Sequence, residues 1–242
     1  MPFTPAHAAV VLPFLKKNVK YISGTGLVMG SFAPDFEYFF KFSVESSFSH
    51  TAAGLFYFDV PVAILLSLLF HSAVKQNFIT NLPYVLRNKF HLLQNLDFTT
   101  YFKANPFTVL FSALFGAASH IIWDAFTHRD GFFVLMLPFY SGTFVPYDGV
   151  MYPLWYALQH ISTVVGLLAV VIYVFMKPGE NVSGDRSPSW WYWLLLTLVT
   201  TLVVAIRFAI RSADYNLGNF VVTSISGFCI ALVVCGLIRF KK

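Results

Sequence analysis

The chain has 242 residues, of which 57% are hydrophobic, 19% aromatic and only 11% charged. A soluble domain carries roughly 25% charged residues, so this composition excludes a soluble globular protein and a disordered chain. The net charge of +5 is spread over short connecting segments and there are two cysteines, which argues against nucleic-acid binding and against a disulfide-stapled secreted domain. A mean hydropathy of +0.67 indicates an integral membrane protein.

The first fifty residues contain two apolar segments that are too short or too interrupted for a clean membrane span. Residues 5–15 are apolar but few, and residues 21–40 are broken by glycines and by Pro34. A spanning helix needs about 20 consecutive apolar residues. We therefore predict a short or re-entrant N-terminal helical hairpin over residues 1–50.

Five later segments are long enough to cross a bilayer as helices. In chain order they are residues 51–73, 106–127, 153–176, 190–210 and 217–238. Residues 74–105 are expected to form a polar connection, and residues 128–152 a longer loop. The last three spans carry few groups capable of chemistry, so we expect a lipid-facing scaffold.

The predicted fold class is therefore all-α, a polytopic helical membrane bundle of about five transmembrane helices. We expect a single integral membrane domain over residues 1–242, with site-bearing spans and loop in residues 51–152 and three scaffold helices in residues 153–242. Five spans place some connecting segments on the same side of the membrane as the C-terminus, and these segments hold more Lys and Arg than the segments on the other side. This excess predicts a cytoplasmic C-terminus. A re-entrant or spanning N-terminal hairpin would undo that count.

The strongest local signal lies at the end of the second span, where His120, Asp124 and His128 follow one another at intervals of four. On a helix these positions share one face, so two imidazoles and a carboxylate can converge on a cation. Such spacing also arises by chance. An aspartate near the end of an apolar span, however, costs on the order of 2 to 3 kcal/mol to insert, so it is expected to face a partner or a cavity.

Four further residues are candidates for the same site. Asp35 follows Pro34 in a turn and Glu37 lies two residues on; His50 opens the first clear span, and His7 lies near the start of the chain. Each alone has an ordinary interpretation as a turn, cap or interfacial residue. The first span leaves one membrane face just after His50 and the second returns to that face at Asp124, so these groups can lie together. They predict a site for one or two divalent ions, zinc or alternatively manganese or iron, with the ligands His7, Asp35, His50, His120, Asp124 and His128.

These residues also carry a resemblance. Residues 1–7, residues 30–37, Ser49-His50-Thr51 and His120-x-x-x-Asp124 resemble an uncharacterised bacterial membrane-protein family, one of the "domain of unknown function" families. That family is similar in turn to the inner-membrane-bound metal-dependent hydrolases. The resemblance covers the first part of the chain, through the predicted loop, and implies a location in the bacterial cytoplasmic (inner) membrane.

More distantly, the order of the ligands resembles that of the zinc-dependent phospholipase C and single-strand nuclease superfamily. That likeness implies one zinc surrounded by Asp35, His50, His120 and Asp124. It also implies a second zinc, bridged by Asp124 and held by His7 and the N-terminus, and a third that takes His128. The superfamily completes its third zinc with a further His-x-x-x-Glu, which this chain lacks after His128, so one or two metals are expected.

The predicted function is metal-dependent hydrolysis of a phosphoester, in which Asp35 or Glu37 accepts the proton of a metal-activated water. A site at the mouth of a membrane bundle favours a lipid or amphiphilic substrate, with membrane lipids as the expected partners. Two alternatives stay open: an ion or solute transporter that uses the same residues, and a membrane scaffold with a structural metal. The sequence does not predict the oligomeric state.

Overall fold

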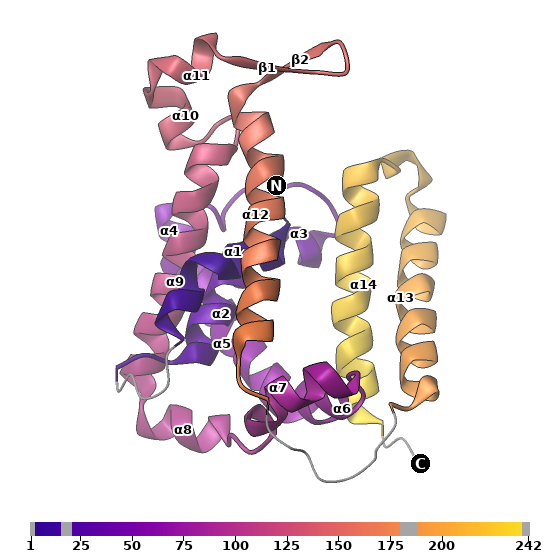
Figure 1. Ribbon diagram of the computed structural model, residues 1–242. Helices are drawn as coiled ribbons and strands as arrows, with labels where there is room; N and C mark the ends of the chain where they lie inside the picture. Colours follow the sequence, from indigo (N-terminus) through magenta and orange to yellow (C-terminus); the bar gives the residue numbers. More distant parts are fainter. Residues whose placement is uncertain (1–2, 16–20, 180–187, 239–242) are drawn as a thin grey trace. The chain divides into compact units, whose positions relative to one another are not determined.

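The computed structural model describes residues 3–15, 21–179 and 188–238. The described chain is almost entirely helical, which confirms the predicted all-α class (Figure 1). Five helices within it are long and apolar enough to cross a membrane. They run over Ala52–Thr80, Pro106–Met136, Leu154–Met176, Trp190–Ile210 and Leu217–Leu237, so the five predicted spans are confirmed as candidate membrane helices.

Backbone contacts divide the chain into two compact units. Unit 1 comprises the described parts of residues 1–34, 48–64 and 105–176, and unit 2 those of residues 35–47, 65–104 and 177–242. That the whole chain forms one integral membrane domain stays a prediction.

The N-terminal segment of unit 1 folds into short helices, as expected. Helix α1 (Thr4–Val11) ends in the 3₁₀ turn Leu12–Phe14, and α2 (Gly24–Phe32) ends in the 3₁₀ turn Ala33–Asp35. Helix α1 packs against α12 (Leu154–Met176), and the Phe3 amide donates to the Thr163 hydroxyl at 3.2 Å. Whether this hairpin enters the bilayer stays a prediction.

The first candidate span is longer than expected. It begins with α4 (Ala52–Gly54), passes through the π-helical turn Leu55–Asp59 into α5 (Val60–Leu69), and continues through a second π-helical turn, Phe70–Val74, into α6 (Lys75–Thr80). The predicted polar connection therefore begins later than residue 74. It contains two more helices, α7 (Tyr84–Gln94) and α8 (Phe98–Ala104).

Helix α9 (Pro106–Thr127) is the structural centre of unit 1, and α2 lies along it (Figure 1). Proline is compatible with the first position of a helix, because a backbone N–H at that position would have no hydrogen-bond partner within the helix. The two backbones approach closely: a Cβ placed on Gly116 would lie 2.2 Å from the Leu27 carbonyl oxygen, and one on Gly30 would lie 2.2 Å from the Ala113 carbonyl oxygen. Only glycine fits at these two positions, so the register between α2 and α9 is tightly specified.

The segment predicted as a long loop holds regular structure. Two short helices, α10 (Phe132–Met136) and α11 (Pro138–Gly142), precede an antiparallel hairpin of β1 (Phe144–Tyr147) and β2 (Val150–Pro153). Asp148 and Gly149 form the turn with positive φ angles of 47° and 73°. An Asp-Gly pair favours this kind of two-residue turn, and it is the signal by which the hairpin is recognisable in the sequence.

Unit 2 is built around two antiparallel helices, α13 (Trp190–Ile210) and α14 (Leu217–Leu237), joined by the 3₁₀ turn Ser212–Asp214. Tyr192 and Leu196 of α13 pack with Ala231 and Cys235 of α14. Helix α3 (Phe36–Lys41) contacts α14, where the Ser226 hydroxyl donates to the Phe39 carbonyl at 2.9 Å.

Candidate metal centre

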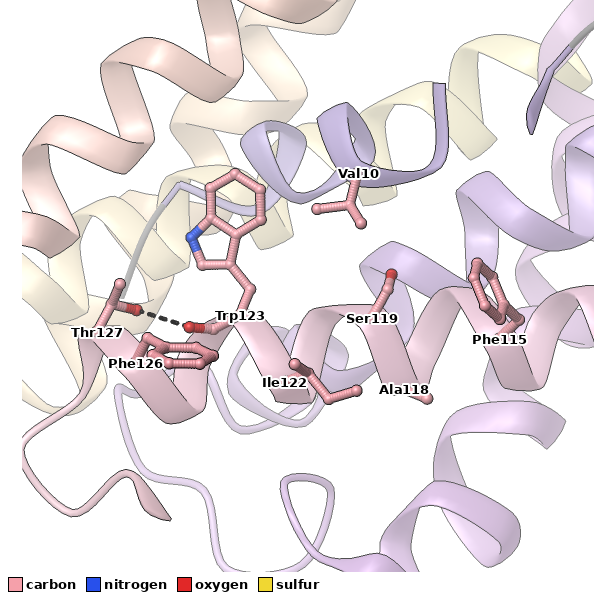
Figure 2. A pocket seen from close by; sticks show the side chains of 8 residues that line it. All are labelled: Val10, Phe115, Ala118, Ser119, Ile122, Trp123, Phe126 and Thr127. Carbon is pink, nitrogen blue, oxygen red and sulfur yellow. Dashed lines mark hydrogen bonds between the residues drawn. The ribbon is translucent and has the colours of Figure 1, made fainter. Parts of the chain in front are cut away.

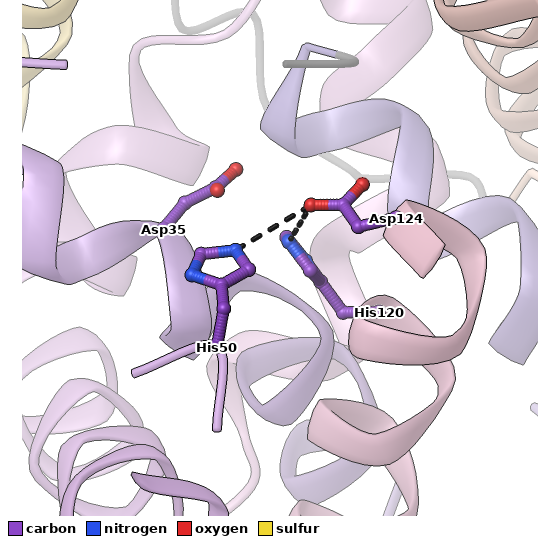
Figure 3. Close-up of side chains that lie close together, drawn as sticks. All are labelled: Asp35, His50, His120 and Asp124. Atoms are coloured by element: carbon purple, nitrogen blue, oxygen red, sulfur yellow. Dashed lines mark ion pairs between the residues drawn. The ribbon is translucent and has the colours of Figure 1, made fainter. Parts of the chain in front are cut away.

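The candidate site is organised around the carboxylate of Asp124, in the last two turns of α9. Its Oδ2 atom lies 3.4 Å from Nε2 of His50 and 3.4 Å from Nε2 of His120 (Figure 3). Together with Asp35, these three residues offer one ligand atom each, and the four atoms all lie within 4.8 Å of one another. This buried cluster of two imidazoles and two carboxylates can hold a metal ion.

The separations within the cluster favour a coordination sphere over direct hydrogen bonds. Charge-assisted hydrogen bonds between nitrogen and a carboxylate oxygen are typically about 2.7–2.9 Å long. Ligand atoms at about 2.0–2.1 Å from a tetrahedral zinc ion are themselves about 3.4 Å apart. The contacts between Asp124 and the two imidazoles, at 3.4 Å each, match the second value.

The two imidazoles are oriented by partners outside the cluster. Nδ1 of His120 lies 2.7 Å from the Ser31 carbonyl oxygen. Because a carbonyl only accepts, the ring donates through Nδ1 and its Nε2 lone pair points toward Asp124. Nδ1 of His50 lies 2.9 Å from the Ser49 hydroxyl, which can accept in the same way. Metal-bound histidines usually have such a partner on their second nitrogen.

Local sequence explains how each group reaches the cluster. His120 and Asp124 are one turn apart on the buried face of α9. Asp35 ends the 3₁₀ turn that continues α2, so the tight α2–α9 packing carries its carboxylate to the site. His50 precedes α4, whose first turn is capped by the Thr51 hydroxyl, which accepts from the Gly54 amide at 2.9 Å.

The other two predicted ligands lie near the second carboxylate oxygen of Asp124. Its Oδ1 atom is 3.5 Å from Nε2 of His7 and 3.5 Å from Nδ1 of His128. The His7 ring stacks on that of His120 with 3.6 Å between centroids. Nε2 of His128 is buried and has no hydrogen-bond partner among the described residues. The structure thus gathers all six predicted ligands, while their binding of metal stays a prediction.

Glu37, the other predicted catalytic acid, has a different setting. Its carboxylate accepts hydrogen bonds from Lys41 Nζ at 2.6 Å, from the Ser46 hydroxyl at 2.8 Å and from the Ser47 amide at 3.0 Å. These bonds tie α3 to the segment that follows it. Glu37 therefore stabilises the connection between α3 and the segment after it, and its role as a proton acceptor stays a prediction.

Comparison with known proteins gives one match. The model of the family "Domain of unknown function (DUF4184)" matches residues 1–237. The chain belongs to this family. The predicted membership in a family of unknown function is confirmed, and the match extends well beyond the part of the chain that carries the resemblance. No curated protein and no solved structure matches the chain, so the likeness to metal-dependent hydrolases stays a prediction.

The four histidines around Asp124 differ in their exposure. The side chains of His120 and His7 are 0% and 1% exposed, whereas those of His50 and His128 are 21% and 29% exposed. The rings of His50 and His128 are therefore the parts of the cluster nearest to solvent. A catalytic metal needs an open coordination position, whereas a structural metal is enclosed by its protein ligands.

Two participants were not assigned a role from the sequence. The Ser31 group that orients His120 is a backbone carbonyl, which any residue supplies, so residue identity carries no signal for it. Trp123 meets the His7 ring edge-on, with 5.6 Å between centroids. An aromatic residue beside Asp124 in an apolar span is also an ordinary lipid-facing side chain, so only its position identifies the contact.

Proposed function

We propose that this protein is a membrane-embedded, metal-dependent hydrolase that cleaves a phosphoester with an activated water molecule. The observation that carries the proposal is the buried carboxylate of Asp124, which four imidazoles surround at 3.4–3.5 Å. From the resemblance and from the distribution of Lys and Arg, we infer that the protein lies in the bacterial cytoplasmic membrane with its C-terminus in the cytoplasm.

The residues present fit a zinc-type ion, with manganese or iron as alternatives. His50, His120, Asp35 and Asp124 form a mixed nitrogen and oxygen donor set of the kind that borderline divalent metals prefer. A second ion on the Oδ1 side of Asp124 would take His7 and His128.

A divalent ion in this position would supply a bound water of lowered pKa and would polarise a phosphoryl oxygen. The protein's own groups supply the rest. Asp35, fully buried at the inner side, accepts the proton of the attacking water at its carboxylate. His50 and His128, whose rings are partly exposed, lie on the side from which we propose that the phosphate approaches. Glu37 keeps the segment after α3 in place.

The substrate we propose is a lipid or another amphiphilic phosphoester. His120 and Asp124 belong to α9, whose 22 residues are by themselves long enough to cross the hydrocarbon core, and they lie toward the C-terminal end of that helix. In a transmembrane helix this end lies near the level of the lipid headgroups, where phosphoesters of membrane lipids are found.

The test is elemental analysis of detergent-purified protein, combined with hydrolysis of a chromogenic phosphodiester on the same samples. Wild type is compared with His120→Ala and Asp124→Ala, and His160→Ala serves as the matched control because His160 is an exposed histidine of α12. We expect stoichiometric zinc, manganese or iron and turnover in the wild type and the control, and loss of both in the two cluster variants.

Two outcomes contradict the proposal in different ways. Well-folded wild-type protein without bound metal would overturn the metal site and favour a transporter or a scaffold. Bound metal that disappears in both variants, without turnover of any phosphoester tested, would favour a structural metal.

A further inference from the structure

A groove of about 480 Å³ lies between α1 and α9 (Figure 2). Val10 of α1 forms one wall, and the other is a stripe of α9 that runs from Phe115 through Ala118 and Ile122 to Thr127. Both helices belong to unit 1, as does the greater part of the candidate metal centre.

The groove offers apolar surface and no charge. No charged residue lines it within the described chain, and two hydroxyl-bearing residues, Ser119 and Thr127, are its main polar members. Both hydroxyls donate to backbone carbonyls of their own helix, Ser119 to Gly116 at 2.7 Å and Thr127 to Trp123 at 3.4 Å. A polar substrate therefore makes few favourable contacts in the groove, whereas a hydrocarbon chain is complementary to its surface.

The direction of the groove matches that of a lipid molecule in a leaflet. It begins at Thr127, beside the cluster at the end of α9, and ends at Phe115 near the middle of this 22-residue helix. Twelve residues of α-helix are about 18 Å long, and one leaflet of the hydrocarbon core is about 15 Å deep. A chain in the groove would thus run from headgroup level to the bilayer centre.

The groove and the cluster meet at Trp123 and Thr127. Successive α-helical residues are about 100° apart, so Trp123 and Thr127 lie between the groove-lining stripe and the stripe of His120 and Asp124. Trp123 lines the groove and meets the His7 ring edge-on, and His7 faces Asp124 at 3.5 Å. A molecule whose tail fills the groove therefore has its polar end beside the cluster.

We propose that this groove binds an acyl chain of a phospholipid and directs its phosphate to the Asp124 cluster. Binding of the chain stands by itself, while the cleavage of that lipid rests on the function proposed above. The occupant is a lipid with a headgroup phosphate, because the imidazoles of the cluster suit a phosphate and the groove suits a hydrocarbon chain.

The test measures binding without turnover. Detergent-purified protein receives a substoichiometric phosphatidylglycerol that carries a photoreactive diazirine on one acyl chain, and the labelled peptides are mapped by mass spectrometry. We expect the label to concentrate on residues 115–127 and around Val10. Equal labelling of α9, α12 and α13 would overturn the proposal.

Matched variants refine the result. Ala118→Phe and, on the opposite wall, Val10→Phe fill the groove and should reduce labelling of residues 115–127 by roughly threefold or more, since such pockets enclose most of their ligand. Leu168→Phe, on the exposed face of α12, should leave it unchanged. Labelling that neither groove variant reduces contradicts the proposal.

A diazirine fatty acid without phosphate distinguishes the two parts of the ligand. Equal labelling by the fatty acid and the phospholipid would show that the phosphate is not recognised, which overturns the assignment to phospholipids. Preferential labelling by the phospholipid in protein that shows no turnover would keep this inference and reject the hydrolase proposal instead.

Discussion

Helices α9 and α13 differ in what they bury, although both lie in candidate spans and are of nearly equal length, 22 and 21 residues. Helix α9 buries a polar face that includes His120 and Asp124, whereas α13 buries only Tyr192 and Leu196 within its unit. Apolar length alone makes each a candidate membrane helix. The buried polar residues of α9 are costly in a bilayer, so they are expected to face a partner or a cavity.

The two helices also pack differently. In unit 1, α9 and α2 are in backbone contact at glycines, and the bond from His120 to the Ser31 carbonyl crosses that contact. In unit 2, α13 and α14 pack through side chains such as Leu196 and Cys235. A backbone contact tolerates no added atoms, whereas a side-chain interface can adjust, so the site region is expected to be the less tolerant of substitution.

The largest effect is expected for Asp124→Asn. This change removes the charge that faces four imidazoles and should weaken zinc binding by more than about 100-fold, because even the loss of a residue that only hydrogen-bonds to a metal ligand costs 10- to 100-fold. The measurement is a competition titration with a chromophoric chelator. The control from unit 2 is Asp214→Asn, which removes the partner of Arg207 at 2.9 Å but no candidate ligand. Equal zinc affinity of Asp124→Asn and wild type would refute the site.

A smaller effect is expected for Gly116→Ala. The added methyl group would lie 2.2 Å from the Leu27 carbonyl oxygen, so the helices must separate, at a cost of about 2–3 kcal/mol in the free energy of unfolding. Thermal unfolding in detergent measures the loss. Gly227→Ala in α14 meets the Thr200 carbonyl oxygen at 3.0 Å and should cost less, and Gly142→Ala, with no atom within 4 Å, should be neutral. The reverse order of stabilities would contradict the contrast between the two interfaces.

Ser49→Ala tests the orientation of His50. The hydroxyl lies 2.9 Å from Nδ1 of His50, and its loss should weaken metal binding by roughly 10-fold while the protein stays folded. Ser162→Ala, which removes a hydroxyl that bonds its own helix in α12, is the control for removal of a serine. Zinc affinity is again the readout. A loss of zinc affinity equal to that of Ser162→Ala would show that Ser49 does not orient His50.

The smallest effect is expected in unit 2, at the exposed start of α8. The Thr100 hydroxyl donates to Asp97 at 2.7 Å, and this bond, together with the Thr100 amide, holds the pKa of Asp97 below its ordinary value. A carboxyl group whose pKa is depressed by folding stabilises the folded state at pH values above its unfolded-state pKa of about 3.9. This stabilisation is lost as the pH falls through the lower pKa of the folded state. Thr100→Val should raise the pKa of Asp97, with unchanged metal content. An NMR titration of the Asp97 carboxyl carbon checks it, and an unaltered pKa would contradict the assigned cause.

Much of the fold could be predicted because its elements are set by local physics. The spans 106–127 and 190–210 coincide with α9 and α13, since an apolar run bounded by proline or by polar residues has one natural helical extent. The first span was predicted too short, because its continuation beyond Ala73 contains Lys75 and Asn77. These residues are polar in the sequence, but in the structure they donate to the backbone carbonyls of Leu96 and Cys235. The hairpin at Asp148-Gly149 was missed within a segment interpreted as loop.

The membrane class, the number of candidate spans and six candidate nitrogen and oxygen ligands could be predicted from the sequence, because hydropathy and residue type are local properties. The arrangement in which His50 and His120 face one oxygen of Asp124 while His7 and His128 face the other follows from the tertiary structure. The tertiary structure also places a groove beside Trp123. These features depend on how closely α2 and α1 approach α9, and that distance is set by packing between residues far apart in the chain.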